Sequence, residues 1–220
     1  MTKATPPALT ELLLKARIKR FPTAQILLYE GDSPSDVFLL KKGVVKLHSI
    51  DEQGNEKILH LLKPLTVIPL AFFSGEGTPT KWYYTTLTEC EVYALPRQEL
   101  EALMEHDWQT AKCLMNCFSQ EVHEVLVRLD SLGKTNIDIK LGIALRYLAV
   151  HHSVKGRSDW AVVMFPVNHQ LLADMIGMSR ESTAIAMKAL ADKKIVRYRR
   201  GTLLKINFNG LEAFIKECSS

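Results

Sequence analysis

The sequence predicts an α+β protein with an N-terminal β-roll (jelly roll), a long central helix and a C-terminal winged helix-turn-helix. Short apolar runs separated by turn residues fill the first hundred residues, and a heptad pattern of apolar residues follows them. The last third combines a helix-glycine-helix pattern with two short strands. A chain of 220 residues, 47% of them hydrophobic, can bury a sizeable core. We expect three parts, at residues 1–106, 107–133 and 134–220.

Cysteine content and hydropathy indicate a soluble cytoplasmic protein. Four cysteines are too few for a secreted disulfide framework, so we expect reduced thiols. No run of eighteen apolar residues occurs, and the N-terminal segment lacks the apolar core of a signal peptide. We therefore expect no membrane association.

The first part predicts evenly spaced strands between residues 23 and 95. Residues 44–50 alternate between apolar and polar side chains, as a half-buried strand does. Residues 56–62 can pair with them across the turn 51–55, in which Gly54 can adopt a positive φ. This segment predicts a β-hairpin within a small barrel or roll.

The central segment changes to helical periodicity. After a short helix at residues 99–105, apolar residues follow Ala111 with alternating gaps of four and three, over three heptads. Such a stripe can pack on its own domain, but its regularity favours a parallel two-stranded coiled coil. Gly133 and Asn136 end the helix. The predicted dimer seam is Met115, Phe118, Val122, Val125, Leu129 and Leu132.

The last part predicts a helix at residues 137–152, a strand at 161–167 and two helices that meet at Gly177. Ser179 can cap the second helix, whose apolar face is formed by residues 183, 186, 187 and 190. Strands at residues 195–198 and 203–208 flank the sequence Arg199-Arg200-Gly201. This order is typical of a helix-turn-helix with a β wing.

The charge is distributed unevenly along the chain. The net charge is +4, yet residues 134–208 contain thirteen Lys or Arg and five Asp or Glu, a surplus of eight. A basic segment suits binding to a phosphate backbone, although solvated basic faces are common.

The helix-turn-helix can be a purely structural corner, but three features favour DNA. Its second helix begins with Ser179, Arg180, Glu181 and Ser182, which suit contacts to base edges in a major groove. The wing and the end of that helix add cations for phosphates, and the upstream seam supplies two-fold symmetry. The cations are Lys188, Lys193, Lys194, Arg197, Arg199 and Arg200.

The sequence resembles the cyclic-AMP receptor protein and fumarate–nitrate regulator (CRP/FNR) family of bacterial transcription factors over nearly its whole length. Residues 29–32, 38–47 and 51–56 are similar to the family's first β-roll strands and the next turn, and residues 172–183 to its helix-turn-helix. The resemblance implies a cyclic-nucleotide-binding-like sensor, a dimerisation helix and a DNA-binding domain. It places Arg180 and Glu181 at base-reading positions and Lys188 at a backbone-facing one, and implies RNA polymerase as a partner.

Departures from the family pattern bear on the operator and the effector. Ile185 stands where many relatives carry a further base-reading Arg, so we expect altered readout there. Residues 69–71 and 80–81 lack the Glu and Arg that grip a cyclic nucleotide in the family, which argues against cyclic AMP. No cluster of four cysteines is present for an iron–sulfur centre.

Aromatic residues occupy the region where the effector would bind. They can be core residues, the interpretation that aromatic side chains favour, or they can line a hydrophobic pocket for haem or another flat ligand. The candidate pocket residues are Phe72, Lys81, Trp82 and Tyr83. His48, His60 and His106 are conceivable haem ligands, but single histidines more often have other roles.

Cys113 and Cys117 lie one helical turn apart and supply only half of a structural zinc site, which favours free thiols.

The sequence as a whole predicts a homodimeric, sequence-specific regulator that binds a palindromic operator and is not an enzyme. The alternatives are a haem- or redox-sensing regulator of the same family and a ligand-binding module that acts on a protein partner.

Overall fold

A computed structural model describes residues 5–75, 77–156 and 159–219. The chain divides into two compact units. The first unit contains residues 1–49 and 59–124, and the second contains residues 50–58 and 125–220.

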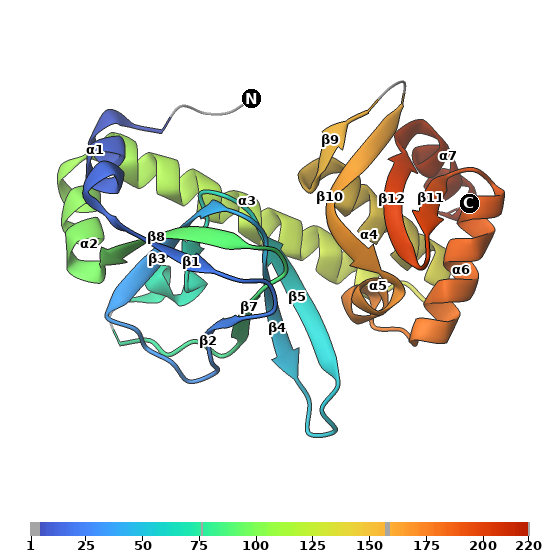
Figure 1. Cartoon of the computed structure of the whole chain (residues 1–220), viewed down its shortest axis with the longest axis horizontal. Helices are drawn as coiled ribbons and strands as arrows, with labels where there is room; N and C mark the ends of the chain where they lie inside the picture. The colour runs from blue at the N-terminus through green and yellow to red at the C-terminus, as the bar shows by residue number, and fades with distance from the viewer. Residues whose placement is uncertain (1–4, 76, 157–158, 220) are drawn as a thin grey trace. The chain divides into compact units, whose positions relative to one another are not determined.

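In the described part of the chain, eight strands and four helices precede residue 137 (Figure 1). The strands form two four-stranded sheets, in the orders β1-β8-β3-β6 and β2-β7-β4-β5, which confirms the predicted β domain. The helical elements are α1 (Pro7–Lys15), η1 (Leu70–Ser74), α2 (Arg97–His106) and α3 (Trp108–Leu132). The strands are β1 (Arg17–Phe21), β2 (Ile26–Leu28), β3 (Asp36–Lys42), β4 (Val45–Ile50), β5 (Glu56–Leu62), β6 (Val67–Ile68), β7 (Tyr83–Thr86) and β8 (Cys90–Pro96).

Strand β3 is buried on both faces and separates two parts of the core. Successive side chains of a strand point to opposite faces, so Phe38 and Leu40 join the cluster inside the roll while Val37 and Leu39 join a second cluster. Helices α1, α2 and α3 cover this second cluster, each with at least one buried leucine. These leucines are Leu9, Leu13, Leu100 and Leu114.

The predicted hairpin of β4 and β5 is present. Gly54 has φ +83° and donates its N–H to the Asp51 carbonyl at 2.9 Å, as the turn requires. The Asp51 carboxylate accepts hydrogen bonds from the side-chain and backbone N–H groups of Asn55, which lower its pKa. The side chain of Asp51 thus fixes the connection between the two strands.

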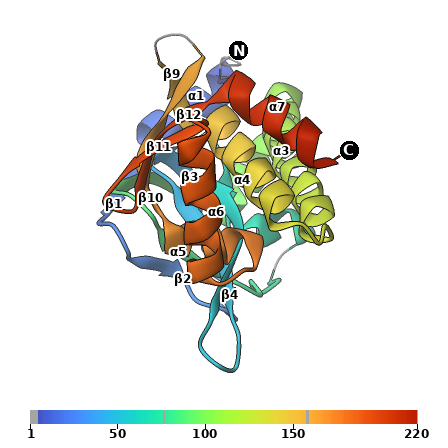
Figure 2. The same cartoon turned by 90° about the vertical axis from the view of Figure 1, so that its right-hand side faces the viewer.

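Among the described residues from 137 onward, four helices pack with a four-stranded sheet in the order β11-β12-β10-β9 (Figure 2). Helices α4 and α7 approach so closely that a Cβ on Gly142 would lie 2.8 Å from Ile215 Cγ1. The helices are α4 (Ile137–His151), α5 (His169–Ile176), α6 (Arg180–Asp192) and α7 (Phe208–Ser219). The strands are β9 (Ser153–Lys155), β10 (Trp160–Asn168), β11 (Val196–Arg199) and β12 (Thr202–Asn207).

The fold class predicted from the sequence is confirmed, with two helices added. Helix α1 precedes the roll, and α7 begins at Phe208, which the sequence pattern placed at the end of a strand. Both helices bury apolar side chains that their own segments cannot cover, such as Leu9 and Leu211. None of the described helices combines the length and hydropathy needed to cross a membrane.

Candidate nucleic-acid interface

The turn between α5 and α6 is built from a left-handed glycine and a capping serine. Gly177 adopts φ +66° and ψ +42°, which ends α5 and redirects the chain. Ser179 then caps α6: its Oγ accepts a hydrogen bond from the Ser182 N–H at 3.1 Å. The Thr183 hydroxyl donates to the Ser179 carbonyl at 2.9 Å. These contacts fix where the exposed first turn of α6 begins.

Helix α6 has one buried and one exposed face. The exposed face starts at Arg180 and Glu181 and continues through Ile185 and Lys188, which follow at helical spacing. Ile185 is 73% exposed, so its apolar side chain points to solvent. The predicted apolar residues Thr183, Ala186, Met187 and Leu190 are all buried.

The wing presents arginines at a tight turn. Arg199 pairs with Thr202, so the loop contains only Arg200 and Gly201, with φ +50° and +76°. Two consecutive positive φ angles form the turn that favours glycine and matches the twist of the flanking strands. Arg199 and Arg200 are exposed. The wing therefore carries two adjacent cations at its tip, a suitable arrangement for phosphates.

Aromatic side chains at the base of the wing were not predicted as part of the interface. The Arg197 guanidinium lies over the Trp160 ring, 4.8 Å from its centroid, which orients an exposed cation. His169, the first residue of α5, contacts the Tyr198 ring edge to face at 5.6 Å. Burial, followed by the positive charge of Arg180, lowers the pKa of His169.

Exposed cations extend beyond the wing. Lys188 is exposed on α6, and Lys193 and Lys194 follow at its end. The Lys193 ammonium lies 4.9 Å from the centroid of the Phe214 ring, which places it beside α7. Every residue predicted to contact DNA is at least partly exposed, and all of them lie on the two elements that the prediction assigned, α6 with its cap and the wing.

The predicted dimer seam on α3 is partly covered by its own chain. Phe118 packs on Phe73, with ring centroids 4.6 Å apart. Val125 and Leu132 are half-buried, whereas Met115, Val122 and Leu129 are 54%, 41% and 63% exposed. The three exposed residues follow one another at intervals of seven, and Leu126 is 56% exposed beside them. Exposed apolar residues at heptad spacing are typical of a helix that pairs with another helix.

The four candidate effector-pocket residues lie in different surroundings. Phe72 is buried in the core beneath the guanidinium of Arg97, which donates a hydrogen bond to the Phe72 carbonyl at 2.8 Å. Lys81 and Trp82 are exposed before β7, and Tyr83 stacks on His48 with centroids 5.5 Å apart. The structure therefore places Phe72 as a core residue.

A small cavity lies between the β5–β6 connection and α3. Its walls are largely apolar. The lining residues are Leu65, Thr66, Val67, Leu70, Phe73, Leu114, Cys117, Phe118 and Glu121.

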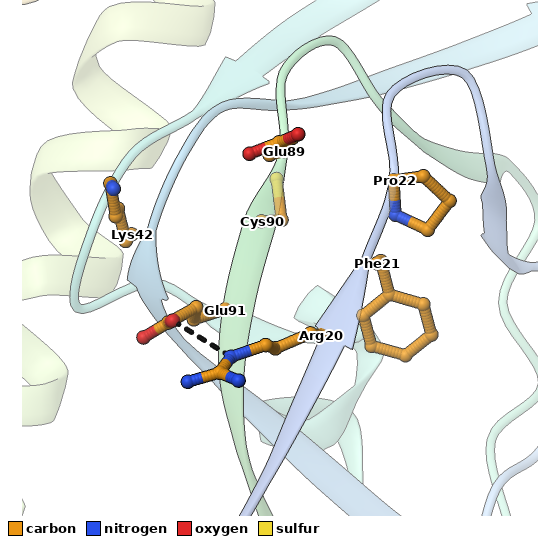
Figure 3. A pocket seen from close by; sticks show the side chains of 7 residues that line it. All are labelled: Arg20, Phe21, Pro22, Lys42, Glu89, Cys90 and Glu91. Carbon is orange, nitrogen blue, oxygen red and sulfur yellow. Dashed lines mark hydrogen bonds and ion pairs between the residues drawn. The ribbon is translucent and has the colours of Figure 1, made fainter.

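A surface pocket at the ends of β1 and β8 is lined by charges of both signs (Figure 3). The Glu91 carboxylate accepts from Lys41 at 3.0 Å and from Arg20 at 3.1 Å, and these cations lower its pKa. Burial raises the pKa of the Cys90 thiol, which disfavours the reactive thiolate. The pocket therefore offers neither one dominant charge nor an activated nucleophile. Its lining residues are Arg20, Phe21, Pro22, Lys42, Glu89, Cys90 and Glu91.

The three histidines considered as haem ligands have protein contacts. The His48 Nε2 lies 2.9 Å from Thr85 Oγ1, and the His60 Nε2 lies 2.5 Å from Glu121 Oε2. The His106 Nδ1 donates to the Ala102 carbonyl at 2.7 Å. None of the four cysteines forms a disulfide bond. No observation on these residues favours haem.

Comparisons with known proteins agree with this architecture. A model of the cyclic nucleotide-binding domain matches residues 18–107, and a model of the Crp-like helix-turn-helix domain matches residues 140–214. A global nitrogen regulator of Synechococcus elongatus is 20% identical over 195 residues, which are 88% of this chain and 87% of that protein. The cAMP-activated global transcriptional regulator CRP of Salmonella typhimurium is 22% identical over 201 residues, 91% of this chain and 94% of that protein.

A solved structure of a CRP/FNR-family transcriptional regulator from Thermus thermophilus shares the fold, with a TM-score of 0.74 and 22% identity over 91% of this chain and 98% of that one. The two matched domains and the exposed basic helix-turn-helix define a DNA-binding transcription regulator. The chain belongs to the CRP/FNR family, as the resemblance implied. The family is non-enzymatic, in agreement with the prediction that the protein is not an enzyme.

Proposed function

We propose that the protein is a cytoplasmic homodimer that binds a palindromic operator and regulates transcription together with RNA polymerase. The observation that carries the proposal is the exposed face of α6. Ser179, Arg180, Glu181 and Ser182 form the cap and first turn of this helix, where polar side chains can reach base edges in a major groove.

The wing supplies the contacts that do not depend on sequence. Arg199 and Arg200 are exposed at the tip of a two-residue loop, and Lys188 is exposed on α6. Each cation that neutralises a phosphate releases counterions and adds to the salt dependence of binding. We assign these three residues to the backbone, because guanidinium and ammonium groups at such positions fix the register of the protein on the duplex.

The dimer forms through α3. Met115, Val122 and Leu129 leave apolar surface in water at every seventh position, and a second α3 in parallel would cover it. Two copies of α6 would then enter successive major grooves, which requires a palindromic site. The symmetry of the operator thus follows from the seam.

The effector, where one is needed, has a chemistry different from that of cyclic AMP. Lys81 is an exposed cation of the N-terminal domain. Residues 69–71 and 80–81 contain neither Arg nor Glu. Phe72 is buried in the core, where its ring packs against other side chains and is not available to a ligand. Trp82 and Tyr83 remain the accessible aromatic groups near this segment.

Selection of bound duplexes from a random DNA pool, with and without cell extract, tests the proposal. We expect enrichment of one sequence with two-fold symmetry. Stronger enrichment in the presence of extract would indicate a diffusible effector. If no sequence is enriched in either condition, the protein is not a sequence-specific regulator, and a module that acts on a protein partner replaces the proposal.

A further inference from the structure

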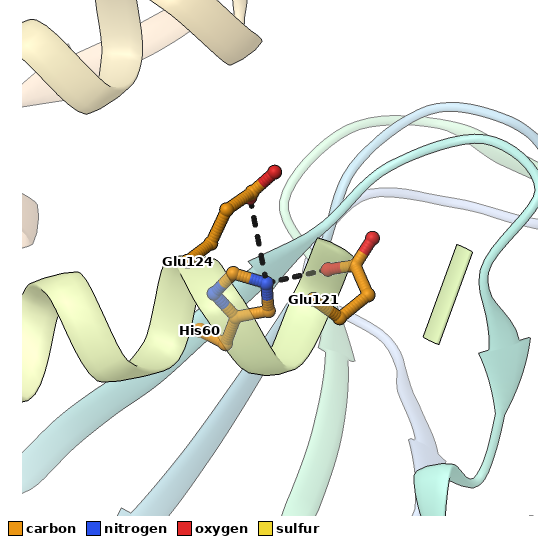
Figure 4. A group of neighbouring side chains, drawn as sticks. All are labelled: His60, Glu121 and Glu124. Atoms are coloured by element: carbon orange, nitrogen blue, oxygen red, sulfur yellow. Dashed lines mark hydrogen bonds and ion pairs between the residues drawn. The ribbon is translucent and has the colours of Figure 1, made fainter. Parts of the chain in front are cut away.

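Strand β5 and helix α3 bring three potential metal ligands together within the first unit (Figure 4). His60 comes from β5, and Glu121 and Glu124 come from adjacent turns of α3. The three side chains are 1%, 3% and 8% exposed. One ligand atom from each of them lies within 4.8 Å of the other two.

The imidazole nitrogen is directed at both carboxylates. The His60 Nε2 lies 2.5 Å from Glu121 Oε2 and 3.8 Å from Glu124 Oε2 (Figure 4). The Thr66 hydroxyl donates to the other oxygen of Glu121 at 3.0 Å, which holds this carboxylate in place. An outer hydrogen bond of this kind is the usual support of a metal-binding carboxylate.

The charge of the cluster also favours a cation. The cluster buries two carboxyl groups, and the burial of an ionised carboxylate is costly unless a cation compensates it. Lys63 supplies a positive charge: its ammonium contacts Glu124 and lies 3.9 Å from Glu121 Oε1. A divalent ion that displaces Lys63 carries twice that charge and would neutralise both carboxylates.

We propose that His60, Glu121 and Glu124 form a binding site for a divalent transition-metal ion, with one imidazole nitrogen and two carboxylate oxygens as ligands. This donor set suits borderline ions such as Zn²⁺, Co²⁺ or Mn²⁺ better than Ca²⁺ or Cu⁺. Ligand atoms about 2.1 Å from one ion lie about 3.4 Å apart at tetrahedral angles. The His60–Glu121 pair at 2.5 Å must therefore open, and pairs as far apart as the 4.8 Å limit must close by about 1.4 Å.

Lys63 is the competitor of the metal in this proposal. Its side chain is 24% exposed, so the ammonium can move toward water while the three ligands stay buried. Metal binding would then replace a salt-bridge network by coordination bonds between β5 and α3. The site is independent of the proposed DNA contacts, which lie on α6 and the wing.

Equilibrium dialysis of the purified full chain against Co²⁺ and against Zn²⁺ tests the site. We expect one ion per chain, and a visible Co²⁺ spectrum of a low-symmetry nitrogen and oxygen site. His60→Gln and Glu121→Gln should each weaken binding by about tenfold or more, since even outer-shell changes cost about that much. The matched control His123→Gln alters an exposed histidine of α3 and should bind like the wild type.

Two further variants distinguish loss of the metal from loss of the fold. Lys63→Met removes the competing ammonium and should tighten metal binding several-fold. A double Cys113→Ser and Cys117→Ser variant should retain the ion, because neither thiol is a ligand. The proposal is overturned if the wild type binds no ion, if Lys63→Met leaves the affinity unchanged or lower, or if the double cysteine variant loses the ion. The cluster would then be a salt-bridge network only.

Discussion

Arg180 and Arg199 are both exposed arginines of the second unit, yet their positions assign them different roles. Arg180 lies in the first turn of α6, where a guanidinium can contact two acceptors of one guanine. Arg199 lies at the end of β11, next to the wing loop, where we expect it to contact the backbone of the duplex.

We predict that Arg180→Ala weakens binding to the selected operator by about 1–3 kcal/mol and relaxes its sequence preference. Arg199→Ala should weaken binding to selected and random duplexes equally. It should also lower the slope of log affinity against log salt concentration by about one. The measurement is affinity against salt concentration on both DNAs. Lys15→Ala, which removes an exposed charge from α1, is the control. Equal losses of affinity by both variants on both DNAs would contradict the assignment.

The environment of His169 predicts that the stability of the second unit depends on pH. Burial and the charge of Arg180 lower its pKa below the ordinary value of 6.5. The unfolded chain therefore binds more protons as the pH falls through 6.5, so the fold loses stability on the acid side and keeps it above that pH. The free energy of unfolding of His169→Asn should fall less between about pH 7.5 and 5.5 than that of the wild type.

Exposed His123 provides the control for this experiment, because His123→Asn should follow the wild type. An acid-side loss of stability of equal size in His169→Asn and in the wild type would show that other groups cause the loss.

His169 could not be found from the sequence as part of the interface. Its contact with Tyr198 and the contact between Trp160 and Arg197 join residues far apart in the chain, and local patterns carry no information on such pairs.

At the scale of elements, the turn of the helix-turn-helix depends on Gly177. Its φ of +66° disfavours any residue with a Cβ, although no atom crowds the position. We predict that Gly177→Ala destabilises the second unit by about 1–2 kcal/mol, and Gly177→Asn by less, because Asn tolerates this conformation better. Thermal unfolding measures both. Equal stability of Gly177→Ala and the wild type would contradict the strain argument.

Elements with strong local signals were predictable, and those defined by packing were not. The hairpin of β4 and β5 follows from alternation and a glycine turn, and α6 follows from its serine cap and apolar face. Helix α7 begins directly after β12. Because apolar residues continue across this boundary, the sequence pattern did not reveal the change from strand to helix periodicity at Phe208. Helix α1 begins after Pro6 with a proline at its first position, but its short apolar run gave this start signal too little support for a helix to be predicted.

The same limit applies to the buried cluster. His60 is 61 residues from Glu121, and only the packing of β5 on α3 brings the two together. From the sequence, His60 was a candidate haem ligand and the two glutamates were not candidates for any site. The structure buries both glutamates.

For the whole molecule, the dimer that we propose depends on the exposed apolar stripe of α3. Leu129 is 63% exposed within this stripe. We predict that Leu129→Gln shifts the protein toward monomer, because each partner would lose buried apolar area at the seam. Sedimentation equilibrium measures the dissociation constant. Leu14→Gln, which alters an 82% exposed leucine of α1, should leave the dimer unchanged. An unchanged Leu129→Gln dimer would show that α3 is not the seam.

The proposed regulator divides its charge unevenly along the chain. Residues 134–208 carry a surplus of eight positive charges, and the remainder of the chain carries a deficit of four. We propose that this distribution favours approach of the phosphate backbone to the basic residues of α6 and the wing.

The dependence of DNA affinity on salt concentration, measured in parallel on the selected operator and on a random duplex, is the sharpest test of a sequence-specific regulator. We predict that both affinities fall steeply with salt, and that the operator binds about 10³-fold or more tighter at physiological salt. Affinities that do not change with salt, or that are equal on the two DNAs, would contradict the assignment of a sequence-specific DNA-binding regulator.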